Sequence, residues 1–565
     1  MKEKKPVSSN NKVRLAPLNF CGTAISPGFS QGITHILHSL LGPIDAPPQS
    51  DELNVDEEIS RLDQATVHIS DELLALATRV EKEIDVRLAE VFSAHKLILN
   101  DQILRDELRK EIAENLVTAS GAVKSVFLRW EKRFLLMESM IAREKADDLR
   151  DISIRLSNAL AGITVHPLES IPEKCVLVTS RLLPSDTMFL GGRSTAAVLL
   201  EYGSLGSHAA LFTRQMGIPC ISDIPNIMTR LPEGKLALVD ANSGLVTINP
   251  DEAMRAVFQN KQHHYEQIIN TSRMHASKPA VTKEGCIIKV NANVGCYEDA
   301  CKAIENGADG IGLYRLEQFY IGRTQPPSFE ELLTEIRHTL TPFKRKHACV
   351  RLLDVGSDKP LPFIGFLAET NPALGRRGIR VMREYPALLR TQIMALLALR
   401  DEFQIQILVP MVAMPEDVKF VRDMLVKQCN ELGISAPQLG AMIETPAAAL
   451  SAHGLAPYVD FISFGTNDLT QYVFAADREN AAVEIYFNDS SEAIFRLIEM
   501  VHNDLPEMPL SVCGELAGRQ EHVAKLLQCG IRSLSVAAPL VATIKENIRN
   551  IKLKGISTHQ QNGFS

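Results

Sequence analysis

Three apolar runs in the second half of the sequence decide the fold: QIQILVPMV at 404–412, QLGAMIETP at 438–446 and FISFGTNDL at 461–469. Each run is short and largely apolar, which is typical of a strand that is buried on both faces of a parallel sheet. A helix-compatible stretch separates each run from the next. This part of the chain is therefore predicted to alternate strand and helix.

The same alternation extends in both directions from these runs. The other candidate strands are CIIKVNANV at 286–294, GADGIGLYR at 307–315, ACVRLLDVG at 348–356, RGIRVM at 377–382 and PLSVCGEL at 509–516. Eight strands separated by helices predict a (β/α)8 barrel, or TIM barrel, over residues 280–550. Its eighth helix is expected near 535–550, and the tail at 551–565 is expected to be loose.

The first half of the chain changes character several times. Residues 1–17 are polar and are predicted to be a flexible extension. Residues 51–155 contain no Pro and one Gly, which predicts a helical bundle. Strand-like runs between Gly and Pro turns predict a compact α/β domain in two pieces, 18–50 and 156–249. Residues 250–279 are expected to link this domain to the barrel, so the fold class is α/β with an inserted bundle.

The predicted bundle at 51–155 is also strongly acidic. From Val55 to Ile84, apolar residues recur at steps of four and three, so a neighbouring helix must cover this seam. The region holds nearly all of the chain's net charge of −8. Two interpretations of this charge stay open: a solvated face of the bundle, or a docking surface for a basic protein.

The composition of the 565 residues excludes several classes of protein. A net charge of −8 argues against a general nucleic-acid or anionic-membrane binder. No stretch holds the roughly 18 consecutive apolar residues that membrane insertion requires. Ten cysteines without any C-x-x-C pair argue against a zinc ribbon or a thioredoxin-type motif. We therefore expect a reduced, cytoplasmic protein.

Charged residues gather where the predicted barrel strands end, which is where barrel enzymes carry their active sites. They are Arg315, Arg351, Glu444 and Asp468, with Arg377 before the predicted fourth strand, Asn467 beside Asp468 and Cys513 after PLSV. Arginine forks match phosphate and carboxylate groups, and carboxylate oxygens suit Mg2+. The set predicts a small phosphorylated acid held with a divalent metal, although a cysteine such as Cys513, taken alone, is more often an inert core residue.

The segment GSLGSHAALFTRQMGIP at 203–219 predicts a short helix with His208 in its first turn. Ser207 is a good N-cap, and Gly217 followed by Pro219 is a stop signal. Unpaired backbone N–H groups at a helix start would favour a phosphoryl group on the imidazole. The local sequence leaves open that this histidine is incidental.

Several blocks of the sequence, in this order, resemble the enzyme I family of the phosphoenolpyruvate-dependent sugar phosphotransferase system, the phosphoenolpyruvate-protein phosphotransferases. The resemblance covers about residues 20–550. The blocks are AISPGFSQG, REKADDLRDISIRL, SHAALFTR, GADGIGLYRLE, RLLDVGSDKPLP, NPALGRRGIR, MIETPAAA, GTNDLTQY and CGELAG.

The resemblance implies a role for each candidate residue. His208 corresponds to the family's phosphorylated histidine, and Cys513 to the group that protonates the enolate. Arg315, Arg351, Arg377 and Arg478 correspond to phosphoenolpyruvate-binding arginines, Asn467 to a phosphate contact, and Glu444 and Asp468 to Mg2+ ligands. The resemblance also implies that the α/β domain swivels, that the helical insert docks an HPr-like phosphocarrier protein, and that a homodimer forms through the barrel.

The sequence departs from the family pattern at Gly206, Leu316, Gln318, Ser357 and Glu479. None of these changes removes a charged catalytic group, and together they suggest a divergent paralogue. A dikinase that makes phosphoenolpyruvate is disfavoured, because the chain has no room for an ATP-binding domain ahead of the His208 domain. A non-enzymatic regulatory or adaptor protein on the same scaffold stays open as the alternative.

Overall fold

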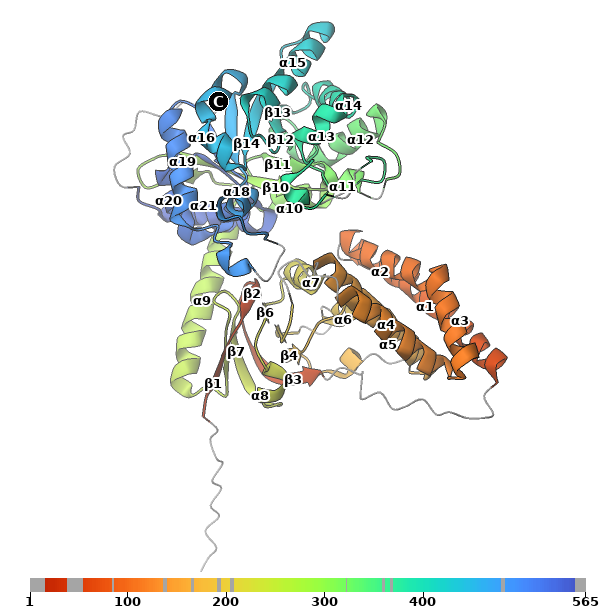
Figure 1. The fold of residues 1–565 in the computed structure, drawn as a ribbon. Coiled ribbons are helices and arrows are strands. Elements are labelled where there is room, and N and C mark those ends of the chain that lie inside the picture. Colours follow the sequence, from red (N-terminus) through yellow and green to blue (C-terminus); the bar gives the residue numbers. More distant parts are fainter. Residues whose placement is uncertain are drawn as a thin grey trace, which may run out of the picture. The chain divides into compact units, whose positions relative to one another are not determined.

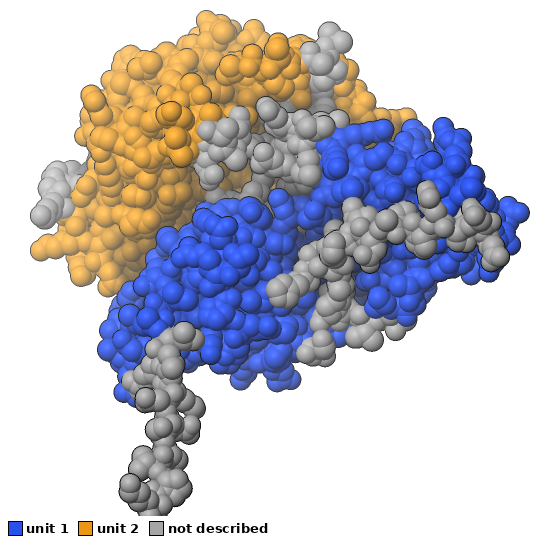
Figure 2. Space-filling model, turned by 60° about the horizontal axis from the view of Figure 1, so that its bottom comes forward, with its two compact units in different colours: residues 1–265 blue, residues 266–565 orange. Residues whose placement is uncertain are grey.

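The structure, a computed structural model, describes residues 16–37, 54–83, 86–135, 140–163, 167–190, 195–203, 208–321, 323–357, 361–365, 369–478 and 483–553. The chain divides into two compact units, residues 1–265 and 266–565, which Figure 2 colours blue and orange. Most of the predicted extension at 1–17 and of the predicted tail at 551–565 lies outside the described residues.

The second unit contains the predicted TIM barrel, which is confirmed (Figure 1). Each strand pairs in parallel with the next along the chain, and the last pairs with the first, so the sheet closes on itself. The strands are β10 (Ile287–Val294), β11 (Ile311–Arg315), β12 (His347–Arg351), β13 (Gln404–Val409), β14 (Gln438–Ile443), β15 (Phe461–Phe464), β16 (Leu510–Val512) and β17 (Ser533–Ala537). The main helices between and after them are α10 (Tyr297–Glu305), α12 (Phe329–Leu340), α14 (Pro386–Ala398), α15 (Pro415–Leu432), α16 (Pro446–Leu450), α19 (Glu492–Asp504), α20 (Gln520–Gln528) and α21 (Val541–Asn550).

Two details of the predicted barrel are wrong. The segment RGIRVM at 377–382 is not a strand, because the chain turns at Gly378, whose φ is +58°, and continues as helix α13 (Ile379–Glu384). The eighth strand is β17, so the eighth helix begins only at Val541. As a consequence Cys513 follows the seventh barrel strand, β16, and Arg377 precedes a helix rather than a strand.

The first unit is built on a mixed sheet in which parallel strands are flanked by antiparallel ones. In spatial order the strands are β1 (Leu18–Cys21), β8 (Leu245–Ile248), β7 (Leu236–Asp240), β3 (Phe29–Leu37), β4 (Val176–Thr179), β5 (Ala197–Leu200), β6 (Cys220–Ser222) and β2 (Thr23–Ser26). Strands β3 to β6 run parallel to one another. Two short helices that matter below, α6 (Pro184–Leu190) and α7 (His208–Met216), belong to this part of the unit.

Between β3 and β4 the chain forms the predicted helices. They are α1 (Val55–Glu83), α2 (Val86–Leu99), α3 (Gln102–Asn115), α4 (Ala119–Leu135) and α5 (Met140–Leu160), drawn in orange to brown in Figure 1. The seam on α1 is buried at Leu62, Ile69, Leu73 and Val80, and α2 to α5 cover it. Ile84, the last position of the predicted seam, lies outside the described residues.

The predicted linker is largely one helix, α9 (Glu252–Met274). The division between the two compact units falls within this helix, after Tyr265. Its first half packs on the sheet of the first unit, because the rings of Phe258 and Tyr265 both contact the ring of Phe29 edge to face.

Candidate active site

The C-terminal ends of the barrel strands carry most of the predicted site residues. Arg315 is the last residue of β11, and Arg351 is the last residue of β12. Glu444 directly follows β14, and Cys513 directly follows β16. Because the barrel strands run parallel, these four residues lie at the same edge of the barrel.

Helix α18 (Thr466–Phe474) begins two residues after β15 and adds two further predicted residues to this edge. Asp468 lies in its first turn and is buried. The side chain of Asn467 accepts a hydrogen bond from the backbone N–H of Glu515 at 2.9 Å. Asn467 therefore ties the start of α18 to the loop that follows β16.

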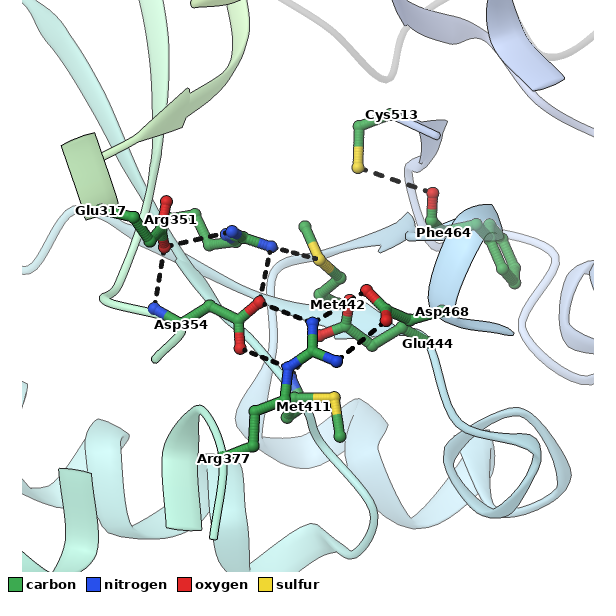
Figure 3. A network of polar contacts seen from close by, with 10 residues as sticks. All are labelled: Glu317, Arg351, Asp354, Arg377, Met411, Met442, Glu444, Phe464, Asp468 and Cys513. Carbon is green, nitrogen blue, oxygen red and sulfur yellow. Dashed lines mark hydrogen bonds and ion pairs between the residues drawn. The ribbon is translucent and has the colours of Figure 1, made fainter. Parts of the chain in front are cut away.

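Arg377 joins two carboxylates at the centre of the site (Figure 3). Its Nη1 and Nη2 donate to the two oxygens of Asp468 at 3.0 and 3.1 Å, while Nε and Nη2 donate to Asp354 at 3.3 and 3.1 Å. Burial by itself would lower the pKa of Arg377, but the charges of Asp354 and Asp468 outweigh burial and raise it. The guanidinium is thus a fixed positive charge between two fixed negative ones.

The loop that carries Arg377 is held by backbone contacts with the end of the β12 segment. Arg377 forms an isolated antiparallel bridge with Gly356, and the N–H of Gly378 donates to the carbonyl of Val355 at 3.0 Å. A side chain at Gly378 would meet Met411 and would also need the left-handed backbone. These contacts explain how a residue outside the strands reaches the strand ends.

Arg351 is anchored in a similar way on the neighbouring strand. Its Nη2 lies 3.1 Å from Glu317 Oε1, and its Nη1 lies 3.1 Å from Asp354 Oδ2. The same Glu317 oxygen accepts the backbone N–H of Asp354 at 2.8 Å. Asp354 therefore orients both arginines and Glu317 orients Arg351, and the sequence analysis singled out neither carboxylate.

Glu444 is buried beside this cluster and accepts a hydrogen bond from the backbone N–H of Met411. Burial and the charges of Asp354 and Asp468 raise the pKa of Glu444 to about 8. We call Glu317, Arg351, Asp354, Arg377, Glu444 and Asp468 the carboxylate–arginine network. In this network four carboxylates face two guanidinium groups, so the network has a surplus of negative charge when all are ionised.

The surplus of carboxylates fits a divalent cation. Mg2+ typically takes one or two protein carboxylates and fills its other positions with water and substrate phosphate oxygens. Glu444 and Asp468 can supply those two carboxylates. Within the described ranges, no group of three or more His, Cys, Asp or Glu side chains is placed to hold a metal.

Two further predicted arginines, Arg315 and Arg478, differ from Arg351 and Arg377 in having no ionic partner. Within the described part of the chain, neither guanidinium forms a hydrogen bond or an ion pair. Desolvation by the surrounding barrel, together with the positive charges of Arg351 and Arg478, lowers the pKa of Arg315. Three guanidinium groups thus lie near one another, and two of them are available to an anionic ligand.

Cys513 is buried at the inner side of the same edge. Its thiol donates a weak hydrogen bond to the carbonyl of Phe464 at 3.5 Å, and it accepts one from Ser463 Oγ at 3.4 Å. Burial raises the pKa of Cys513 above its ordinary value of 9.0. The side chain is therefore a neutral thiol with a proton to give, and it packs with Leu313, Met442 and other residues that fill the barrel.

The predicted histidine belongs to the other compact unit. Helix α7 begins at His208, as predicted, and Gly217, whose φ is +65°, directly follows its last residue, Met216. The N–H of Ile218 then returns to the carbonyl of Thr213 at 2.9 Å, which closes the last turn. The side chain of His208 and the residue Ser207 lie outside the described part of the structure.

Three of the five departures from the family pattern can be placed. Leu316 is fully buried in the barrel core, and Gln318 occupies the space that Gly295 leaves open. Ser357 has a buried hydroxyl with no hydrogen-bond partner among the described residues. Gly206 and Glu479 lie outside those residues.

Comparison with known proteins yields three matching family models. Residues 270–553, half of the chain, match the PEP-binding domain of PEP-utilising enzymes. Residues 171–244 match the mobile domain of the same enzymes, and residues 21–145 match their N-terminal domain. Among the described helices, every one is too short or too polar to cross a membrane.

Curated relatives match over almost their whole length. A phosphoenolpyruvate-protein phosphotransferase of Priestia megaterium is 32% identical over 89% of this chain and 90% of its own. The proteins of the same name from Geobacillus stearothermophilus and Listeria monocytogenes are 31% and 30% identical. The Listeria protein matches 94% of each chain.

Proposed function

The chain belongs to the family of phosphoenolpyruvate-protein phosphotransferases, and from that premise we propose that it phosphorylates itself on His208 and passes the phosphoryl group to a histidine of an HPr-like carrier protein. Family membership makes it an enzyme that transfers a phosphoryl group from phosphoenolpyruvate. The observation that carries the finer proposal is the convergence of unpaired and paired arginines with Glu444 and Asp468 at one edge of the barrel.

Phosphoenolpyruvate has a phosphate and a carboxylate, and the site offers two kinds of arginine for them. Arg315 and Arg478 are free of ionic partners in the described structure and would bind the anionic groups directly. Asp354 holds the side chains of Arg351 and Arg377 in place. Their positive charges therefore face the substrate without the side chains having to rearrange during the reaction. Mg2+ on Glu444 and Asp468 would neutralise charge on the phosphate.

The reaction forms a bond between phosphorus and an imidazole nitrogen of neutral His208 and breaks the bond between phosphorus and the enol oxygen. The enolate that leaves is high in energy, and it becomes pyruvate only when its carbon atom gains a proton. We assign that proton to the thiol of Cys513, which would regain one from water. Catalysis is then mainly positioning and electrostatic stabilisation, as in other phosphoryl transfers.

The second half of the reaction needs His208 to meet a carrier protein. Each compact unit has its own core, and one helix, α9, joins them. We propose that the unit with His208 reorients as a rigid body between the two half-reactions. The family resemblance also predicts a homodimer through the barrel, which sedimentation of the full chain would test.

The carrier would dock on an exposed apolar patch of the helical bundle. We define the docking face as Val67 and Leu74 of α1, Leu97 of α2 and Ile103 of α3, all of which are exposed. The hydrogen bond from Asn100 Nδ2 to Ser70 Oγ, at 3.2 Å, sets the end of α2 beside α1. Asp71, Asp101 and Asp106, which lie within a few residues of this face in the sequence, are also exposed, and we take them as its rim. An apolar centre with an acidic rim suits a basic partner.

Replacing Leu97 by Asp should weaken binding of an HPr-like carrier by about tenfold or more, because an apolar contact becomes a charge. Binding to the unmodified chain should also weaken as salt rises, since the acidic rim attracts through screened charges. Titration calorimetry at several salt concentrations measures both effects. Leu450→Asp, an equally exposed leucine on α16 of the barrel, is the matched control. Affinity that stays flat from low to moderate salt would argue against this docking face.

Replacing Cys513 by Ala should slow the formation of pyruvate by about 100-fold, the usual scale for loss of a general acid. Phosphorylation of His208 in a single turnover should change far less, because phosphorus moves before carbon is protonated. Since the raised pKa keeps the thiol protonated, pyruvate formation should hold up at alkaline pH, where an ordinary thiol would already be losing its proton. Quenched-flow assays of both products separate the steps.

Cys349→Ala is the control for that experiment, because Cys349 is a second buried cysteine in the same cluster inside the barrel. Its removal should leave the formation of pyruvate intact. If Cys513→Ala and Cys349→Ala behave alike, Cys513 is a core residue and another group protonates the enolate.

Incubation of the full chain with phosphorus-labelled phosphoenolpyruvate and Mg2+ tests the proposal as a whole. We expect label on the peptide that contains His208, stable to base and labile to acid, and transfer of that label when an HPr-like carrier is added. A non-enzymatic adaptor would acquire no label. A pull-down that compares candidate carriers would then identify the acceptor.

A further inference from the structure

Three aspartates of the segment REKADDLRDISIRL, all on α5, make contacts that the proposed reaction does not use. They are Asp147, Asp148 and Asp151, and each points to a different element of the first unit. Asp147 Oδ2 accepts from Nη1 of Arg181 at 3.2 Å, just ahead of α6. The first aspartate thus ties the bundle to the chain that enters α6.

Asp148 binds a buried histidine on another helix of the bundle. Its Oδ1 lies 3.0 Å from Nε2 of His95, which belongs to α2, and both side chains are almost completely buried. Its Oδ2 lies 3.1 Å from Nζ of Lys145. The second aspartate therefore fixes α5 against α2, the helix that carries Leu97 of the docking face.

Asp151 of α5 is buried, and its carboxylate contacts both α6 and other residues of the bundle. Its Oδ2 accepts the backbone N–H of Ser185, in the first turn of α6, at 2.9 Å. The same oxygen lies 3.9 Å from Nδ1 of His95. Its Oδ1 lies 3.5 Å from Nε of Arg155. One carboxylate thus bonds to the start of α6 and forms an ion pair with Arg155, while it lies near His95 of α2 without a hydrogen bond to Nδ1 of that ring.

Arg155 continues the connection to the surface of α1. Its Nη1 lies 2.6 Å from Oε1 of Glu72, an exposed residue next to Asp71 at the rim of the docking face. A continuous series of polar contacts therefore runs from Glu72 through Arg155 and Asp151 to the first turn of α6.

Helix α7, which begins at His208, contacts α6 and packs against two separate cores. On one side Ala210 packs in the core of the sheet, and Nε of Arg214 donates to the carbonyl of Ile25 at 2.7 Å. On the other side Phe212 is fully buried in the core of the helical bundle. If the contacts of α7 with the bundle were lost, its contacts with the sheet would remain. Helix α7 would then stay folded, but its position relative to the docking face would vary more.

We propose that Asp151, supported by Asp147, is a positioning residue that keeps α6 and α7, and with them His208, in register with the carrier-docking face. This inference rests on the proposed function. Phosphorylation of His208 by phosphoenolpyruvate needs only that α7 keeps its packing contacts with the sheet. Transfer to a carrier also needs the distance between His208 and the docked protein to be right, and an error of about 1 Å can cost 100-fold in rate.

The test measures the two half-reactions separately in the full chain. For Asp151→Ala we expect kcat/KM for transfer to an HPr-like carrier to fall by about 10- to 100-fold. Single-turnover phosphorylation from phosphoenolpyruvate should stay within about twofold of the unmodified chain. Asp151→Asn, whose side-chain oxygen can still accept the N–H of Ser185, should recover part of the loss. Asp147→Ala, which breaks a partly exposed pair and is safe for folding, should show a smaller effect of the same kind.

Glu131→Gln is the matched control, because it breaks an ion pair to the neighbouring Arg150 of α5, at 2.7 Å, without touching α6. It should leave both half-reactions unchanged. Equal losses in both halves for Asp151→Ala, or unchanged transfer to the carrier, would overturn the proposal.

Hydrogen exchange provides a readout that needs no carrier. In Asp151→Ala we expect faster exchange of the amides of α6, residues 184–190, with the core of the bundle still protected. Faster exchange throughout the bundle, or none in α6, would reduce Asp151 to an ordinary stabilising residue. If the unmodified chain takes up no label from phosphoenolpyruvate, the proposed function fails, and the exchange experiment still decides whether α5 positions α6.

Discussion

Replacing His208 by Ala should abolish labelling of the chain by phosphoenolpyruvate. Without the imidazole there is no nucleophile to receive phosphorus, and loss of a nucleophile costs about a millionfold in covalent catalysis. The substitution should not disturb folding, because His208 is the first residue of α7 and Ala is a strong helix former. Autoradiography after incubation with labelled phosphoenolpyruvate and Mg2+ measures the effect.

The control for this experiment is His453→Ala. His453 lies on the short helix α17 (Ala452–Leu455), where its side chain is exposed, and no half-reaction uses it. Its removal should leave labelling intact. Label that persists in His208→Ala would place the phosphoryl group on another side chain and would remove α7 from the mechanism.

The barrel could be predicted from the sequence mainly because its strands are buried on both faces. Such strands appear in the sequence as short apolar runs, and seven of the eight are predicted in that form: four between 404 and 516, preceded by CIIKVNANV, GADGIGLYR and ACVRLLDVG. Strand β17 was not predicted, because Ser533 and Ser535 face the barrel interior. There they form hydrogen bonds with Asn291 and Asn293 at 3.1 and 2.7 Å. Polar residues at buried positions hide a strand from a search for apolar runs.

The prediction of a strand at RGIRVM was wrong for the opposite reason. Ile379, Val381 and Met382 are all buried, so the run is as apolar as a strand, yet its last four residues form the first turn of a helix. Periodicity cannot separate strand from helix over so few residues. The turn at Gly378 decides between them, because its positive φ and the lack of room for a side chain beside Met411 both favour glycine there.

The candidate site could be predicted residue by residue but not contact by contact. Charged residues at strand ends identify Arg315, Arg351 and Glu444, since parallel strands bring their ends together. The sequence does not indicate that Asp354 bridges Arg351 and Arg377, because that depends on how two loops meet across the bridge between Gly356 and Arg377. The distinction between paired and unpaired arginines is likewise a property of the folded chain.

Replacing Asp468 by Asn should lower Mg2+-dependent labelling of the chain by about a thousandfold. Two effects combine. The substitution removes one of the two carboxylates proposed to hold Mg2+, and metal affinity depends on ligand charge. It also turns one acceptor oxygen of residue 468 into an amide N–H donor, so the guanidinium of Arg377 loses one of its two hydrogen bonds with that side chain. Higher Mg2+ should recover part of the first effect and none of the second, and a Mg2+ titration of the labelling rate separates them.

The fold should survive this change, because Arg377 keeps both contacts with Asp354 and so is not left as an unpaired buried charge. Thermal unfolding should show a modest loss of about 1–3 kcal/mol. Asp309→Asn is the matched control: Asp309 also pairs with a buried cation, Lys545 at 2.6 Å, but it precedes β11 and so lies at the opposite edge of the barrel. Because that variant should lose stability without losing labelling, it separates damage to the fold from damage to the site. Full labelling by Asp468→Asn, with an unchanged dependence on Mg2+, would exclude Asp468 from the metal site and would leave Glu444 without its proposed partner.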